Sequence, residues 1–183
     1  MSGTTNTAAV KEGIKKAQAF SALHKLGGML YFCTNVEMAE RNVNVLVETM
    51  AGVNKDKKAA SWGKFLISCN DNAVCAVGHV PSDLASSKGF TVHEWKERLM
   101  EMATKFAGCS VMTLSDGTND EFVKFVIDVD PMAETFPFKL CDAIVAHSTT
   151  VLKEMGLISA APSSSREDED DDIDYAGALD MVW

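Results

Sequence analysis

The chain has 183 residues, 46% of them hydrophobic, and carries a formal net charge of −9 at pH 7. That length fits one domain with tails, and the apolar content is sufficient for a core. No run approaches the roughly 18 uninterrupted apolar residues of a membrane span. The N-terminal stretch MSGTTNTAAVKEG lacks the charged-then-apolar pattern of a signal peptide. We therefore expect neither a membrane protein nor a secreted one.

The negative charge is concentrated near the C-terminus. Residues 166–183 contain eight acids and one base, a net charge of −7, which leaves −2 for residues 1–165. The larger part of the chain is nearly neutral, so composition excludes the strongly basic class of nucleic-acid binders. Five cysteines, none in a CxxC motif, indicate buried thiols in a reducing compartment. Cytoplasmic localisation is the corresponding expectation.

The first part of the chain alternates helix and strand signals. Hydrophobic spacing predicts a helix over residues 8–25 that ends at Gly27-Gly28. The apolar run MLYFCTN then predicts a buried strand, and Asn35 is a candidate N-cap for a second helix. This helix is expected to close at Gly52. The following segment, NKDKKAAS, is interpreted as a basic loop.

Two β-hairpins and two helices are predicted in the second part. The runs GKFLISCN and AVCAVGHV flank Asp71-Asn72, and the runs CSVMTL and EFVKFVIDV flank Asp116-Gly117, which are turn signals between strands. Between the hairpins, a short polar loop follows Pro81 and leads to a helix opened by Thr91. The segment PFKLCDAIVAHSTTVLKEMG supplies the last helix.

The helix after Thr91 carries a single apolar stripe. Its members, separated by 3, 4, 3 and 4 residues, are Val92, Trp95, Leu99, Met102 and Phe106. Thr91 and Glu94 fit a capping box, in which each side chain accepts a hydrogen bond from the backbone amide of the other residue. The pattern predicts a helix packed across a sheet, with Trp95 buried.

The predicted order is α-β-α-β-β-α-β-β-α. Strands paired by hairpins and covered by helices indicate an α+β fold with a mixed, largely antiparallel sheet. We expect an N-terminal helix (residues 1–27), a single α+β domain (28–157), and a flexible spacer with a disordered acidic tail and an apolar end (158–183).

The passage around the Thr91 helix resembles a known family. The pattern consists of Val-Pro, an alanine, a basic residue, a glycine, a large apolar residue and Glu-Trp. In this chain the matching residues are Val80, Pro81, Ala85, Lys88, Gly89, Phe90, Glu94 and Trp95. This is similar to the DHH-associated C-terminal domain of alanyl-tRNA synthetases, over roughly residues 28–107. The resemblance implies a free-standing, non-catalytic relative of an accessory domain that contacts tRNA. The chain departs from the family at Gly108-Cys109-Ser110, where the family's glycine-rich stretch is missing.

The candidate nucleic-acid contacts are lysines near the first hairpin and in the passage that resembles the synthetase domain. They are Lys55, Lys57, Lys58, Lys64 and Lys88. If they converge, they form a patch that faces phosphate groups, and its binding is strongly dependent on salt. An ordinary solvated loop is the alternative interpretation.

The C-terminal residues are the candidate protein-binding site. Acids from Glu167 to Asp174 precede five apolar side chains, namely Tyr175, Leu179, Met181, Val182 and Trp183. Three interpretations remain open: capture of a protein partner, folding back of the tail onto the Lys55–Lys64 loop, and a tail without a partner.

Residues with catalytic or metal-binding spacing are not found in the sequence. The four histidines are dispersed, and the chain has neither a phosphate-binding glycine motif nor a nucleophile elbow. We expect no enzyme, no metal and no cofactor, and a small hydrolase is the least supported hypothesis. A translation-linked module that binds tRNA or a translation complex is the first hypothesis. A protein-interaction adaptor that has lost nucleic-acid binding is the second.

Overall fold

The computed structural model describes residues 6–114 and 120–158. The helices are α1 (Thr7–Gly27), the 3-10 helix η1 (Glu37–Ala39), α2 (Val43–Val53), α3 (Lys57–Ala60), α4 (Ser82–Lys88), α5 (Val92–Ala103) and α6 (Pro137–Glu154). The strands are β1 (Tyr31–Asn35), β2 (Gly63–Cys69), β3 (Ala73–His79), β4 (Cys109–Thr113) and β5 (Phe122–Val129). This confirms the predicted α+β class. The expected acidic tail lies outside the described residues.

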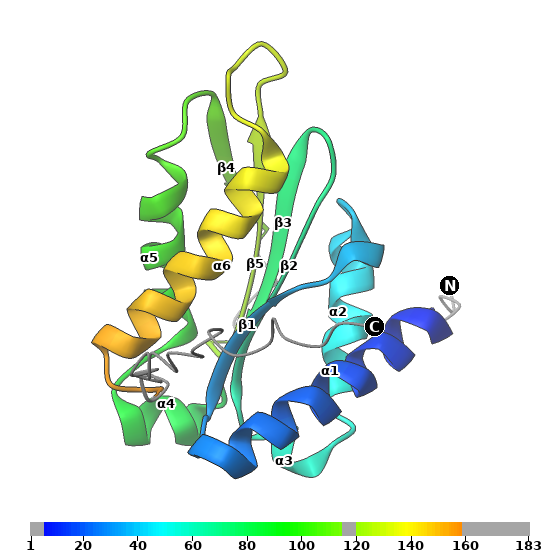
Figure 1. Ribbon diagram of the computed structural model, residues 1–183, viewed down its shortest axis with the longest axis vertical. Coiled ribbons are helices and arrows are strands. Elements are labelled where there is room, and N and C mark those ends of the chain that lie inside the picture. Colours follow the sequence, from blue (N-terminus) through cyan, green and yellow to red (C-terminus); the bar gives the residue numbers. More distant parts are fainter. Residues whose placement is uncertain (1–5, 115–119, 159–183) are drawn as a thin grey trace, which may run out of the picture.

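The described strands form one sheet in the order β1-β2-β3-β5-β4. Strand β1 pairs with β2 in parallel, whereas the other neighbours are antiparallel, so the sheet is mixed and largely antiparallel. Helices α1, α2 and α3 cover one face, and α4, α5 and α6 cover the other (Figure 1). Every residue of β2 and β3 is buried, because these two strands are covered on both faces.

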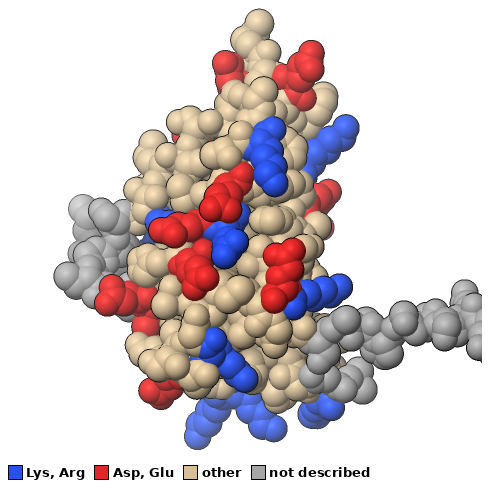
Figure 2. Space-filling model, turned by 90° about the vertical axis from the view of Figure 1, so that its left-hand side faces the viewer, with Lys and Arg blue, Asp and Glu red and all other residues tan. Residues whose placement is uncertain are grey.

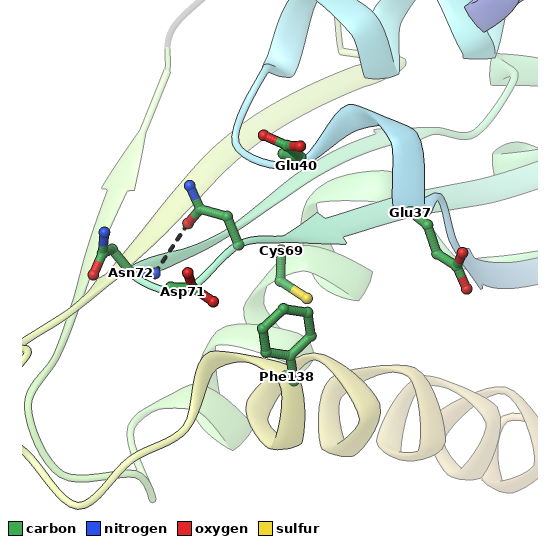
Figure 3. A pocket seen from close by; sticks show the side chains of 7 residues that line it. Glu37, Glu40, Cys69, Asp71, Asn72 and Phe138 are labelled. Atoms are coloured by element: carbon green, nitrogen blue, oxygen red, sulfur yellow. Dashed lines mark hydrogen bonds between the residues drawn. The ribbon is translucent and has the colours of Figure 1, made fainter.

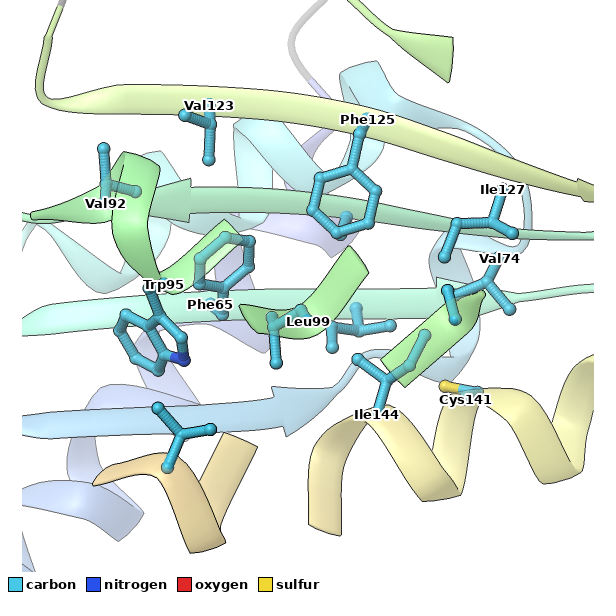
Figure 4. Packing of buried hydrophobic residues seen from close by; sticks show 14 of the residues in the cluster. Phe65, Val74, Val92, Trp95, Leu99, Val123, Phe125, Ile127, Cys141 and Ile144 are labelled. Atoms are coloured by element: carbon cyan, nitrogen blue, oxygen red, sulfur yellow. The ribbon is translucent and has the colours of Figure 1, made fainter. Parts of the chain in front are cut away.

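One core lies between the sheet and the helices α4–α6. The Trp95 ring is fully buried, with its centroid 5.0 Å from that of Phe65, and Phe125 lies next to Phe65 on the sheet (Figure 4). The indole Nε1 donates a hydrogen bond of 2.9 Å to Ser148 Oγ on α6. The predicted burial of Trp95 against the sheet is confirmed.

The second core lies between the sheet and α1–α3, and it depends on a close helix crossing. A Cβ added at Gly13 of α1 would lie 2.0 Å from the Thr49 carbonyl oxygen, and one added at Gly52 would lie 2.3 Å from that of Val10. Gly52 is therefore inside α2 and in contact with α1. The expectation that it closes the helix is wrong, because α2 continues to Val53.

Three local predictions need correction. Asn35 ends β1 and is no helix cap; α2 begins later, where Asn42 Oδ1 accepts hydrogen bonds from the Asn44 and Val45 amides. The predicted basic loop contains the short helix α3, and the predicted polar loop after Pro81 is α4. Helix α3 has four residues and α4 has seven. Helices this short do not show a recognisable hydrophobic periodicity in the sequence.

Other local predictions are confirmed. Strands β2 and β3 form the first hairpin around Asp71, with the Asn70 amide donating to the Ala73 carbonyl. Strands β4 and β5 pair as expected, although the Asp116-Gly117 turn lies outside the described residues. At the start of α5, Thr91 Oγ1 accepts a hydrogen bond from the Glu94 amide, which is one half of the predicted capping box. Among the described helices, none is both long and apolar enough to cross a membrane.

Candidate functional site

Four of the five predicted lysines lie at one end of the sheet. Helix α3 precedes β2 and α4 follows β3, and because these strands are antiparallel, with Lys64 opposite His79, both helices lie at the same end. Figure 1 shows this as the lower end of the molecule, and Figure 2 shows basic side chains projecting from it. The side chains of Lys55, Lys57, Lys58 and Lys88 are all exposed.

The local sequence fixes the helices that carry these lysines. Asp56 caps α3, because its Oδ1 accepts hydrogen bonds of 2.8 and 3.0 Å from the Lys58 and Ala59 amides. Helix α4 ends after Lys88 at Gly89, whose φ of 65° is a left-handed conformation that glycine adopts at little cost. Lys57, Lys58 and Lys88 are therefore held on short, capped helices.

A further lysine joins this end. Lys25 is exposed in the last turn of α1, which contacts α3. Helix α1 leads into β1, so the parallel pairing of β1 with β2 places Lys25 near the start of β2. The sequence offers no signal for this pairing. Within the described part of the chain, the ion pairs involve other residues. We refer to Lys25, Lys55, Lys57, Lys58 and Lys88 as the lysine end.

Lys64 does not belong to this surface, which corrects the expectation for that residue. Its side chain is fully buried, and its Nζ donates hydrogen bonds to the carbonyl oxygens of Ala59 (2.7 Å) and Ala60 (3.2 Å) at the end of α3. Burial lowers the pKa of Lys64 to about 7. The ammonium group holds α3 against the sheet and cannot contact a ligand in solution.

A polar cluster lies beside Lys64. Burial and the neighbouring Lys64 charge lower the pKa of His79 to about 4, and its Nε2 lies 3.8 Å from Glu121 Oε2. Glu121 Oε1 accepts hydrogen bonds from the Ser82 hydroxyl and amide, which lower the pKa of this carboxyl. The imidazole thus contacts the carboxylate and not the hydroxyl, unlike the serine–histidine contact of nucleophilic catalysis. The cluster joins α4 to the start of β5.

A hollow of about 410 Å³ lies at the opposite end of the sheet. Its lining consists of Glu37, Glu40, Cys69, Asn70, Asp71, Asn72 and Phe138. Figure 3 shows the Phe138 ring beside the Cys69 thiol, with the Asp71 carboxylate on the β2–β3 turn. Burial raises the pKa of Cys69, so its thiol is protonated at neutral pH. In the described residues there is no group of three acidic, cysteine or histidine side chains arranged to hold a metal.

The end of the sheet opposite the lysine end is rich in acidic side chains. Acidic side chains gather around the hollow and the loop that follows β5, namely Glu37, Glu40, Asp71, Asp130, Glu134 and Asp142. Figure 2 shows acidic groups near the upper end of the molecule, away from the lysine end. We call this group the acidic end. Both ends are mixed, since Asp56, Asp83 and Glu121 lie beside the lysines and Lys139 lies beside the hollow, but exposed lysines gather at one end and acidic side chains at the other.

The predicted protein-binding residues of the tail lie outside the described residues. They are Tyr175, Leu179, Met181, Val182 and Trp183. A scan of the chain against protein-family models finds no match, and a search of curated proteins finds no similar sequence.

Proposed function

We propose that this protein is a non-catalytic, translation-linked binding module that contacts RNA, with tRNA as its first candidate, through the lysine end. The observation that carries this proposal is the gathering of exposed lysines, without ion pairs among the described residues, at one end of a nearly neutral domain. Ammonium groups of this kind release counterions when they bind phosphate, which favours association with nucleic acids. The resemblance of residues 28–107 to the synthetase domain supports tRNA as the ligand.

The polarity of the domain supports the same proposal. An RNA that approaches the lysine end meets five exposed ammonium groups, whereas an approach to the acidic end meets mainly carboxylates, so the first orientation is favoured. Lys57, Lys58 and Lys88 are on capped helices, so their backbone positions are set before RNA binds.

Two quadruple variants with the same charge change test the proposal. In the first, Lys55, Lys57, Lys58 and Lys88 are replaced by Gln. In the second, the replaced residues are Lys11, Lys15, Lys105 and Lys139, which are exposed and lie outside the lysine end. We expect the first variant to lose tRNA binding at low salt and the second to retain it, with both melting as the wild type does. Each lost phosphate contact should reduce the slope of log K against log salt by about 1.

Two results would contradict the proposal. One is a wild-type protein that does not retard tRNA even at low salt. The other is an equal loss of binding in the two variants, which would show that net charge, and not the lysine end, governs the interaction.

A protein-interaction adaptor is the second candidate function. The loop between β5 and α6 and the first turn of α6 expose three large apolar side chains, Met132 (91% exposed), Phe136 (63%) and Phe138 (55%). Such groups are typical of surfaces that contact proteins. Crosslinking in cells, with RNA and protein partners scored in the same sample, distinguishes the candidates, because an adaptor recovers protein and no RNA.

A further inference from the structure

The chain leaves the described domain at the lysine end. Helix α6 ends at Glu154, and Leu157 and Ile158 then pack against the core between the sheet and α4–α6. The Leu157 amide donates a hydrogen bond of 2.9 Å to the Leu152 carbonyl, which fixes this exit. Figure 1 shows the end of α6 beside α4.

A strongly acidic segment follows a few residues after the point where the chain leaves the domain. Residues 167–174 contain seven of the chain's acids and no base; we call them the acidic segment. Eight residues lie between Ile158 and Glu167, and a chain of that length extends to about 30 Å at most. The acidic segment can therefore reach the lysines on α4 and α3.

Charge decides between the two ends of the domain. The five lysines attract the acidic segment, although Asp56 and Asp83 on the same short helices weaken this attraction, whereas the acidic end repels the segment. Solvent-exposed charge pairs are individually weak and are screened by salt. Attachment to the same chain offsets this weakness, because it gives the segment a high effective concentration at the lysine end.

We propose that the acidic segment of this chain occupies the lysine end and competes there with RNA. The contact itself is independent of the proposed function, whereas the competition rests on it. An acidic segment presents carboxylates to the same ammonium groups that would bind phosphate, so the two occupants exclude each other. The weakness of each pair leaves the segment displaceable by RNA, whose phosphates are more numerous.

The contact is tested without RNA by NMR. Backbone amide signals are compared between the full chain and a chain that lacks residues 167–183, at about 50 mM and 500 mM salt, since the Debye length falls steeply over that range. We expect differences at Lys25, Lys55–Lys58 and Lys88 that disappear at high salt, and none at the acidic end. Absence of differences at the lysine end, or differences that persist at high salt, would overturn the proposal.

The competition is tested with tRNA and matched variants. One variant replaces Asp168, Asp170, Asp171 and Asp172 by Asn, and the control replaces Glu37, Glu40 and Glu134 by Gln and Asp71 by Asn. We expect the first to bind tRNA about tenfold more tightly than the wild type, since a tethered competitor is weakened. The control should change affinity less than about twofold, because its charges lie beyond a Debye length from the lysine end.

The outcomes separate the two proposals. If NMR detects the contact but no variant binds tRNA, the proposed function fails and the contact stands. If tRNA binds and both charge variants change affinity equally, the competition is wrong and net charge explains the effect. A tail that contacts a separate protein partner instead gives no differences at the lysine end in the isolated chain.

Discussion

The hydroxyl of Tyr31 lies in the core without a hydrogen-bond partner among the described residues. Its ring packs between Phe90 and Trp95, and burial raises its pKa to about 12. An unsatisfied buried hydroxyl opposes folding, because it loses its hydrogen bonds to water. The position therefore favours phenylalanine.

We expect Tyr31→Phe to raise the free energy of unfolding by about 1 kcal/mol, since the ring contacts remain and the desolvation penalty is removed. Urea denaturation measures this change. The control Tyr31→Leu removes ring contacts and should lower stability. A Tyr31→Phe variant less stable than the wild type would show that the hydroxyl is satisfied in solution.

The buried Lys64 makes stability depend on pH. Its pKa is about 7 in the folded protein, against 10.5 for an exposed lysine. Between these values the unfolded chain binds more protons than the folded one, so stability rises as pH rises. We expect a gain of about 1.5 kcal/mol between pH 7 and pH 8.5 from this residue.

Urea midpoints of the wild type and Lys64→Met across this pH range isolate the contribution. The variant cannot take up a proton at this position, so its curve should rise less steeply by that amount. Parallel curves would mean that Lys64 is solvated and charged in the folded protein.

At the scale of elements, the crossing of α1 and α2 is the most constrained contact of the second core. Gly13 and Gly52 allow the two backbones to approach until a Cβ would overlap a carbonyl oxygen. Backbone atoms of two packed helices cannot move aside individually. A substitution here must separate the helices, which loosens the packing of both against the sheet.

Gly52→Ala should therefore lower the free energy of unfolding by about 1–3 kcal/mol, although alanine has the higher helix propensity, by about 1 kcal/mol. Thermal or urea unfolding measures the change. Ala51→Gly, at an exposed position of the same helix, is the control for propensity and should cost about 1 kcal/mol. A stabilised Gly52→Ala protein would contradict the close crossing.

At the scale of the whole molecule, the charge distribution is the property that bears on function. Five exposed lysines gather at one end of the sheet and six acidic side chains at the other, although each end also carries some of the opposite charge, and the chain leaves the domain at the lysine end. Net charge alone hides this arrangement, because positive and negative charges nearly cancel over residues 1–165 as a whole. Binding experiments should therefore compare variants that remove charge at different positions, and should state the salt concentration.

The sequence by itself determined the principal strands and helices, the first hairpin, and the burial of Trp95. These follow from local signals: hydrophobic period, turn residues and caps act within a few residues of each other. The pairing of β1 with β2, the α1–α2 crossing at Gly52 and the burial of Lys64 were decided by tertiary structure alone. Lys64 shares its sheet face with Leu66 and Ser68, and only the packing of α3 closes over it. Likewise, Lys25, Lys57 and Lys88 meet at one end only because distant elements pack there, which no local pattern records.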